Sequence, residues 1–359
     1  MQQSSQIKKL LIKLVYFIPF PLIMISVCLY ADPARIFDGG RYESEIVKVL
    51  VSGKNAGNIR NHNDRLLQKF YAENINQAPD ILAIGSSRSM QISQDLFPNE
   101  TFHNSSVPNA TLEDLMTVIE FYLEKGLKPK KVVLGIEPWI FNADNGHTRW
   151  KDFRNEYLAA YHHVTNKTGK TKKDFKLIDD KYLTLLSPSY FQKSLYILFR
   201  PKSVGEFYIT DKSEADEPIK MSDGSYVYGK DMRNLTAEQV LNVAKKRIED
   251  KAIGYEKFNP QLVDLFEQYI SYLQDNGIEV IFYLGPYHPA TYKQILESSK
   301  YDIVCDVEIY LRTFASEKGI KIIGSYDPAV ADVGIEDFHD WVHARREAVA
   351  RIFHKFMEN

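Results

Sequence analysis

Residues 80–89, DILAIGSSRS, place a short apolar run directly before a turn of glycine and serine. The run from Ile81 to Ile84 is apolar throughout, which is typical of a buried strand in a parallel sheet. The turn puts Ser87 where that strand ends. A serine hydroxyl becomes a nucleophile only if a histidine accepts its proton and a carboxylate orients the histidine. The stretch therefore predicts both a strand and a candidate nucleophile.

A histidine and a carboxylate occur together late in the sequence. Asp340 and His343 are three residues apart, just before the last helical pattern. Glu336 and His339 repeat this spacing four residues earlier, but we prefer Asp340 and His343 because the final helix begins immediately after them. The sequence thus predicts a triad of Ser87, Asp340 and His343, with no metal or other cofactor. A metal site in the same loop is the alternative, with these ligands: Asp337, His339, Asp340 and His343.

The composition narrows the class of protein. The chain has 359 residues, 44% of them hydrophobic, which is typical of a globular protein. Its 45 basic and 47 acidic residues give a net charge of −2, so no basic excess points to a nucleic-acid partner. We do not expect Cys28 to pair with Cys305, because Cys28 lies in an apolar segment near the start of the chain.

That apolar segment predicts a membrane anchor. Residues 14–31 carry no charge and follow Lys8, Lys9 and Lys13. As a helix rising about 1.5 Å per residue they would span roughly 27 Å. We therefore expect a cytoplasmic N-terminus over 1–13 and a transmembrane helix over 14–31. This helix would cross the cytoplasmic (inner) membrane once, and the remaining chain would lie on the extracytoplasmic side. A cleaved signal peptide is the alternative, but Leu29-Tyr30-Ala31 is a poor cleavage site.

After residues 32–79, expected to form a membrane-proximal helical segment, strand and helix patterns alternate through a catalytic domain over 80–359. An insertion over about 142–232, weak in periodicity, is expected to carry substrate specificity. Thr111 and Asp114 indicate a capping box for one helix. The alternation predicts an α/β fold, a three-layer α/β/α sandwich with a parallel sheet. The expected strands are 81–84, 131–136, 278–284 and 320–323, and the expected helices are 111–125, 236–251, 259–276, 302–318 and 344–357.

Other polar and aromatic residues follow the predicted strands, where active sites of parallel sheets form. Glu137 and Trp139 follow the second strand, and Tyr287 and His288 follow the third. We expect these four to contact substrate. Buried aromatic packing is the alternative for Trp139, and a rigid loop corner is the alternative for Tyr287 and His288.

These motifs resemble the SGNH (GDSL-like) hydrolase superfamily. Gly85-Ser86-Ser87 is similar to its nucleophile turn, and Asp340 with His343 is similar to its late Asp-x-x-His pair. The resemblance covers roughly residues 80–356, without the insertion. The chain looks most like the membrane-anchored members that act in cell-envelope acylation, such as the teichoic acid D-alanyl transfer and alginate acetylation proteins.

The resemblance implies how an oxyanion would be bound. Family members use the nucleophile's N–H, a glycine, and an asparagine in a Gly-x-Asn-Asp block. Here that block reads Gly135-Ile136-Glu137-Pro138, so the asparagine is missing. We expect the backbone N–H of Arg88 and the amide of Asn109 or Asn104 to serve instead. Glu137 would disfavour an oxyanion unless a cation pairs with it, and Arg88 is the natural partner.

The resemblance also implies a function. The chain is expected to be an extracytoplasmic serine-dependent O-acyltransferase or esterase. It would act on a cell-surface polysaccharide or other envelope polymer through an acyl-serine, beside a multi-pass membrane-bound O-acyltransferase. The alternative is a non-catalytic, membrane-tethered polysaccharide-binding or assembly subunit on an SGNH scaffold. The missing asparagine favours that alternative, and the retained Ser87, Asp340 and His343 disfavour it.

Overall fold

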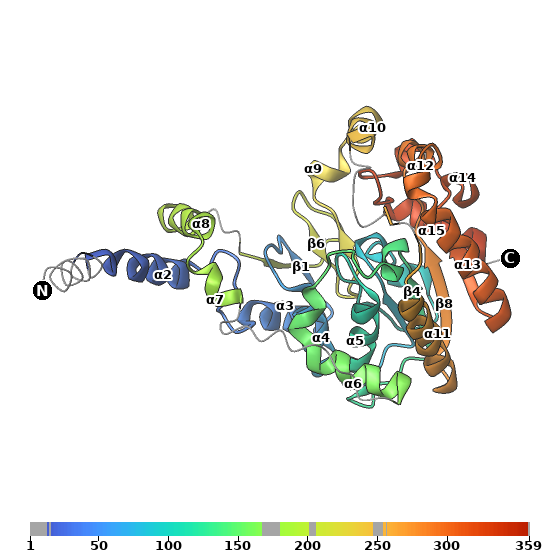
Figure 1. The fold of residues 1–359 in the computed structure, drawn as a ribbon, viewed down its shortest axis with the longest axis horizontal. Coiled ribbons are helices and arrows are strands. Elements are labelled where there is room, and N and C mark those ends of the chain that lie inside the picture. The colour runs from blue at the N-terminus through green and yellow to red at the C-terminus, as the bar shows by residue number, and fades with distance from the viewer. Residues whose placement is uncertain are drawn as a thin grey trace, which may run out of the picture.

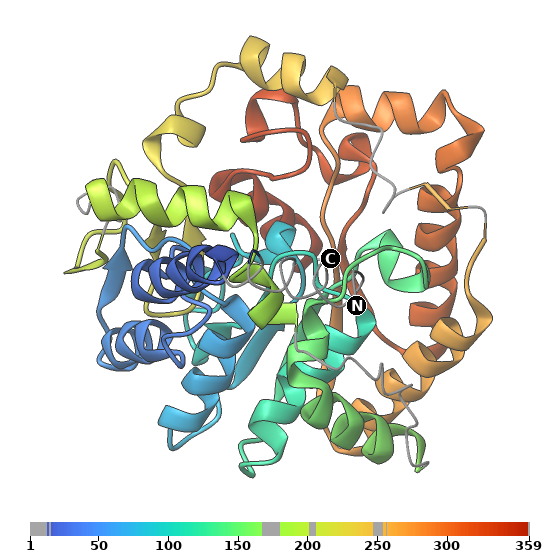
Figure 2. The same ribbon diagram turned by 60° about the vertical axis from the view of Figure 1, so that its left-hand side comes forward.

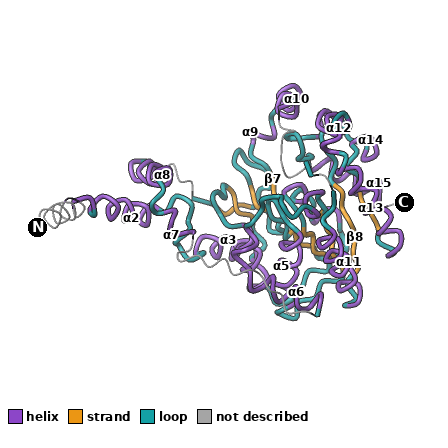
Figure 3. Tube along the Cα trace, in the orientation of Figure 1, coloured by secondary structure: helices purple, strands orange, loops and turns teal. Residues whose placement is uncertain are grey.

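A parallel sheet forms the centre of the molecule (Figures 1 and 3). The computed structural model describes residue 13 and residues 16–166, 180–200, 206–246, 254–255 and 257–357. The predicted α/β fold with a parallel sheet is confirmed. The strands lie in the order β3-β2-β4-β8-β9, with these bounds: β2 (Ile81–Ile84), β3 (Phe102–Asn104), β4 (Lys131–Gly135), β8 (Glu279–Leu284) and β9 (Lys321–Gly324).

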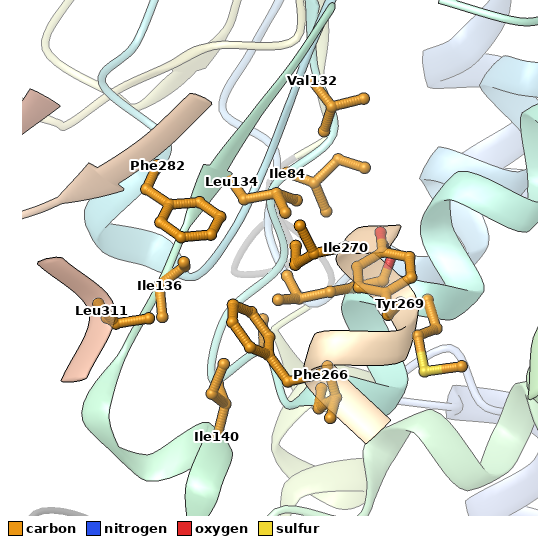
Figure 4. Packing of buried hydrophobic residues seen from close by; sticks show 14 of the residues in the cluster. Ile84, Val132, Leu134, Ile136, Ile140, Phe266, Tyr269, Ile270, Phe282 and Leu311 are labelled. Atoms are coloured by element: carbon orange, nitrogen blue, oxygen red, sulfur yellow. Dashed lines mark hydrogen bonds between the residues drawn. The ribbon is translucent and has the colours of Figure 1, made fainter. Parts of the chain in front are cut away.

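Helices cover both faces of this sheet, so the layers are helix, sheet and helix. Successive strand residues point to opposite faces: Leu82 and Ile84 pack in one apolar cluster, and Ile81 and Ala83 pack in another. Figure 4 shows Ile84 and its neighbours on β4 and β8 against side chains of α11 and α13. The first face is covered by α5 (Leu112–Leu123), α11 (Pro260–Asp275) and α13 (Ile303–Lys318), and the second by α15 (Arg346–Met357). Helix α6 (Arg154–Thr165) packs on α5 and α11, and α10 (Ala237–Lys246) packs on α12 (Pro289–Leu296).

Helix α5 forms where its sequence predicted it. The Thr111 side chain accepts the Asp114 N–H, and the Asp114 carboxylate accepts the Thr111 N–H, so both halves of the capping box are present. The chain leaves the helix through Gly126, whose φ of +71° suits glycine. The other predicted strands and helices are also observed, shifted by one or two residues. The predicted helix over 236–251 is observed as far as Lys246, and residues 247–251 lie outside the described residues.

A second, antiparallel sheet combines strands from two segments that were predicted to be separate, 32–79 and the insertion over about 142–232. Its strands lie in the order β5-β1-β6-β7. Strand β1 (Asn55–Gly57) comes from the predicted membrane-proximal segment. It pairs with β5 (Tyr208–Thr210) and β6 (Ile219–Lys220) of the predicted insertion, and β6 pairs with β7 (Tyr226–Val227). The first segment also forms α3 (Arg41–Val51) and α4 (Asp64–Asn74), and shorter helices elsewhere are α9 (Lys230–Arg233), α12 (Pro289–Leu296) and α14 (Pro328–Ala331).

Helices α2 (Pro19–Ala31) and α8 (Pro188–Phe199) lie side by side and extend from one side of the molecule (Figures 1 and 2). Met24 and Cys28 of α2 are buried against Tyr190 of α8, near the short helix α7 (Asp180–Thr184). Cys28 and Cys305 are both free thiols.

The predicted transmembrane anchor over 14–31 is wrong. Helix α2 has 13 residues, and at about 1.5 Å per residue it spans roughly 20 Å, short of a bilayer core. Across the described ranges we find no helix both long and apolar enough to cross a membrane. The single-pass location that followed from the anchor is therefore not supported. The predicted cytoplasmic segment over 1–13 falls outside the described residues except for residue 13.

Candidate active site

The structure brings Ser87, His343 and Asp340 together. The Ser87 hydroxyl oxygen lies 2.8 Å from Nε2 of His343, across 256 residues of sequence. Nδ1 of His343 lies 2.7 Å from Oδ2 of Asp340. The histidine and aspartate side chains keep 19% and 17% of their surface exposed, so the group is in contact with solvent. Nucleophile, base and orienting carboxylate thus have the geometry of a catalytic triad.

The hydrogen bonds of Asp340 fix the tautomer of His343. A carboxylate only accepts hydrogen bonds, so Nδ1 of His343 carries the hydrogen and Nε2 is left to accept the Ser87 proton. The other carboxylate oxygen of Asp340 accepts the N–H groups of Val342 and His343, each at 2.9 Å. Burial alone would raise the pKa of Asp340, but these hydrogen bonds and the His343 side chain lower it to about 2.

Two glycines make room for the nucleophile turn. Ser87 begins a 3₁₀ turn, η1 (Ser87–Ser89), that follows β2 directly. A Cβ at Gly85 would lie 2.4 Å from the hydroxyl oxygen of Ser89, and one at Gly135 would lie 1.8 Å from it. Both contacts are too short for real atoms, so Ser89 fits between β2 and β4 only because both positions are glycine.

A buried ion pair lies next to the nucleophile. The Arg88 guanidinium donates to Oε2 of Glu137 at 2.5 Å and to the carbonyl of Gly285. The Ser86 hydroxyl donates to Oε1 of Glu137 at 2.6 Å. The pairing of Arg88 with Glu137 expected from sequence is therefore observed. Burial alone would lower the pKa of Arg88, but the Glu137 charge and nearby tyrosines, Tyr287 first, raise it.

The four predicted substrate contacts are buried instead of facing solvent. Glu137 is 2% exposed, Trp139 9%, and Tyr287 and His288 are fully covered. The indole N–H of Trp139 donates to the Ala110 carbonyl at 2.8 Å, and His288 caps helix α12 through its Nδ1. In the structure these side chains take the positions given as alternatives, aromatic packing for Trp139 and a loop corner for Tyr287 and His288, and their contact with substrate stays a prediction.

Two of the predicted oxyanion donors are already hydrogen-bonded. The Arg88 N–H donates to the Ser86 hydroxyl oxygen at 3.0 Å, and the Asn104 amide donates to two backbone carbonyls of the nucleophile loop. Asn109 is exposed in the turn after β3, with a φ of +53°, and its role stays a prediction. The N–H of Ser87 makes no hydrogen bond within the described ranges, so it is the donor available to an oxyanion.

The alternative histidine lies outside the triad. His339 is 4% exposed, and burial, followed by the charge of Arg345, lowers its pKa to about 4. Glu336 is exposed, and Asp337 pairs with Arg351 at 2.6 Å. Among the residues the structure describes, no group of three or more histidine, cysteine or acidic side chains is placed to hold a metal ion.

Tyr228 lies beside His343, although no sequence pattern predicted it. Its ring centre lies 5.7 Å from that of His343 and 4.9 Å from that of His339. Burial raises its pKa well above the usual value for tyrosine. Strand β7 brings it there, because the Tyr226 N–H donates to the Met90 carbonyl at 2.9 Å, beside the nucleophile turn. A lone tyrosine in a stretch of weak periodicity carries no sequence signal for this role.

Comparison with known proteins identifies a family but no activity. Residues 16–343 match the model of a family described as protein of unknown function (DUF1574), and the match includes Ser87, Asp340 and His343. No curated protein matches the chain. Since the family model covers well over half of the sequence, the chain belongs to the DUF1574 family.

Proposed function

We propose that this protein is a serine-dependent acyl-transfer enzyme of the SGNH type. The observation that carries the proposal is the hydrogen-bonded chain from Ser87 through His343 to Asp340. Ser87 Oγ attacks the carbonyl carbon of an ester or thioester, and its proton passes to Nε2 of His343. The Ser87 N–H stabilises the oxyanion that forms. As the bond to the leaving alcohol or thiol breaks, His343 returns the proton to that group.

The acyl group then leaves Ser87 by the reverse route. A hydroxyl group gives its proton to His343 and attacks the acyl carbon, the bond to Ser87 Oγ breaks, and the serine takes the proton back. A carbohydrate hydroxyl as acceptor makes the protein a polysaccharide O-acyltransferase, and water makes it an esterase. A membrane-bound O-acyltransferase partner would supply the acyl group in the first case, and co-purification with such a partner tests it.

The test is active-site labelling with a fluorophosphonate probe, which reacts with an activated serine. We expect the full chain to label at Ser87, as mapped by peptide mass spectrometry. Ser87→Ala should lose labelling and lower p-nitrophenyl acetate hydrolysis by about 10³-fold or more, with an unchanged circular dichroism spectrum. An unlabelled wild-type protein, or an equally active Ser87→Ala protein, would contradict the proposal.

One observation favours a second candidate, a non-catalytic polysaccharide-binding subunit. Two of the expected oxyanion donors, the N–H of Arg88 and the amide of Asn104, are engaged elsewhere. A missing donor costs about 2.7–4 kcal/mol of transition-state stabilisation. Retained polysaccharide binding by a wild-type protein that does not label would support this candidate.

A further inference from the structure

Both chain neighbours of the nucleophile are held by one carboxylate. Ser86 donates its hydroxyl hydrogen to Oε1 of Glu137 at 2.6 Å, and Arg88 donates from its guanidinium to Oε2 at 2.5 Å. The Ser86 oxygen in turn accepts the N–H of Arg88 at 3.0 Å. Ser86, Arg88 and Glu137 therefore form a closed ring of hydrogen bonds that links the residues on either side of Ser87. We call these three residues the Ser87 clamp.

The clamp connects the carboxyl ends of three neighbouring strands. Ser86 and Arg88 follow β2, and Glu137 follows β4. Arg88 also donates to the carbonyl of Gly285 and lies with Cζ 4.1 Å from the ring centre of Tyr287, both of which follow β8. The position of the nucleophile turn is thereby fixed to the centre of the sheet, and not to a surface loop.

Stability alone does not explain such a pair. The side chains of Arg88 and Glu137 are each 3% exposed. Removing two charges from water is costly, and apolar residues of similar volume often stabilise a fold as well as a buried ion pair does. The clamp also decides which N–H near the nucleophile stays free. Ser86 accepts the Arg88 N–H, while the Ser87 N–H has no acceptor within the described part of the chain.

We propose that Arg88, Glu137 and Ser86 are positioning residues for Ser87. They hold its hydroxyl against His343 and leave its N–H free for the oxyanion. Arg88 also neutralises the Glu137 charge near the place where negative charge develops. This inference rests on the proposed acyl-transfer function. Displacing a nucleophile by about 1 Å costs on the order of 10²-fold in rate, so loosening the clamp should act on the chemical step.

The decisive variant is the double substitution Arg88→Met with Glu137→Leu. It removes both charges and keeps the volume, so the midpoint of urea unfolding should stay near that of the wild type. Saturating fluorophosphonate kinetics should show kinact lower by about 10- to 100-fold and KI within about twofold. For p-nitrophenyl acetate, kcat should likewise fall while KM stays nearly unchanged. A stable double variant with wild-type kinact would overturn the proposal.

Ser86→Ala gives a second measurement if the double variant does not fold. It keeps the ion pair and removes only the two hydrogen bonds of the Ser86 hydroxyl. We expect a folded protein whose kinact is about 10-fold lower, and an unchanged kinact would contradict the clamp. Arg88→Lys retains the charge but lacks the guanidinium fork, so it should recover only part of the rate.

Lys69→Met with Glu156→Leu is the matched control. Glu156 pairs with Lys69 at 2.6 Å, and this pair joins α6 to α4. The same chemical change there should leave kinact and KI unchanged. Failure of the proposed function looks different, because the wild-type protein would then not label at all. Failure of the clamp alone leaves the wild-type protein and these variants labelling at the same rate.

Discussion

The two ring nitrogens of His343 have different partners, and these partners set which nitrogen carries the hydrogen and which accepts one. Asp340 holds the hydrogen on Nδ1, and Ser87 faces the lone pair of Nε2. His339 is also close to Tyr228, but it is buried and lies outside this chain of hydrogen bonds. Of the two acid-x-x-His pairs in this loop, only Asp340 with His343 is therefore positioned next to Ser87.

Asp340 gives a pH prediction at the residue scale. Because its pKa is lowered from 3.8 to about 2, ionised Asp340 stabilises the folded chain above pH 3.8, and this stabilisation is lost as the pH falls through 2. It amounts to roughly 2 kcal/mol at pH 7, and about half remains at pH 3. Asp340→Asn should therefore lower the free energy of urea unfolding more at pH 7 than at pH 3. An equal loss at both values would contradict the assignment.

At the scale of elements, the Asp114 carboxylate both caps helix α5 and forms an ion pair with helix α4. Asp114 completes the capping box with Thr111. It also accepts a hydrogen bond from Arg65 of α4, whose Nε lies 2.6 Å from Oδ1. The side chains of Arg65 and Asp114 are 4% and 2% exposed. The start of α5 and its contact with α4 therefore depend on the same side chain.

Two substitutions separate these tasks. Thr111→Ala removes half of the cap and should lower the free energy of unfolding by about 1 kcal/mol. Asp114→Asn leaves the Arg65 charge buried without its partner and should lower it by about 3–5 kcal/mol. Urea unfolding of both variants measures the difference. Equal losses would show that the ion pair contributes nothing beyond the cap.

Local signals explain which elements were predictable. The cap of α5 and the apolar run of β2 each depend on residues close together in sequence, and both were predicted correctly. The strands of the small sheet have two or three residues each, and their partners lie far away in sequence, as for Ala56 with Ile209. No periodicity is readable over such lengths. The anchor was predicted from apolar composition alone, which does not show where the helix begins.

At the scale of the whole molecule, the antiparallel sheet is joined to the parallel sheet by hydrogen bonds near the Ser87 turn. The backbone N–H of Asn104 donates to the carbonyl of Asp223 at 2.8 Å, and Arg346 of α15 donates to the Ser225 hydroxyl. The triad residues were predictable because each follows a strand or precedes a helix. Tyr228 was not, because only the docking of the two sheets places it by His343.

Gly224 tests this docking. A Cβ there would lie 2.3 Å from the Asn104 carbonyl oxygen and 2.6 Å from Cε1 of His103, and its φ is +77°. Gly224→Ala should therefore separate β6 and β7 from the main sheet and reduce labelling of Ser87. Hydrogen exchange should rise in β6 and β7 and stay slow in β4 and β8.

Gly126→Ala is the control for Gly224→Ala. Gly126 has a similar φ of +71°, but a Cβ there would have no neighbour within 4 Å. It therefore measures the backbone strain alone, about 1–2 kcal/mol. If both variants label and exchange alike, steric exclusion at Gly224 is not what keeps the sheets docked.

The separation of 256 positions between Ser87 and His343 also has a consequence for biosynthesis. A ribosome adds about 5–20 residues per second, so the serine precedes its base by roughly 13–50 s. During that time the nascent chain carries an ordinary, unreactive hydroxyl. If Ser87 acts as proposed, a chain interrupted anywhere in this interval would not label with a fluorophosphonate, so labelling would report that translation has passed His343.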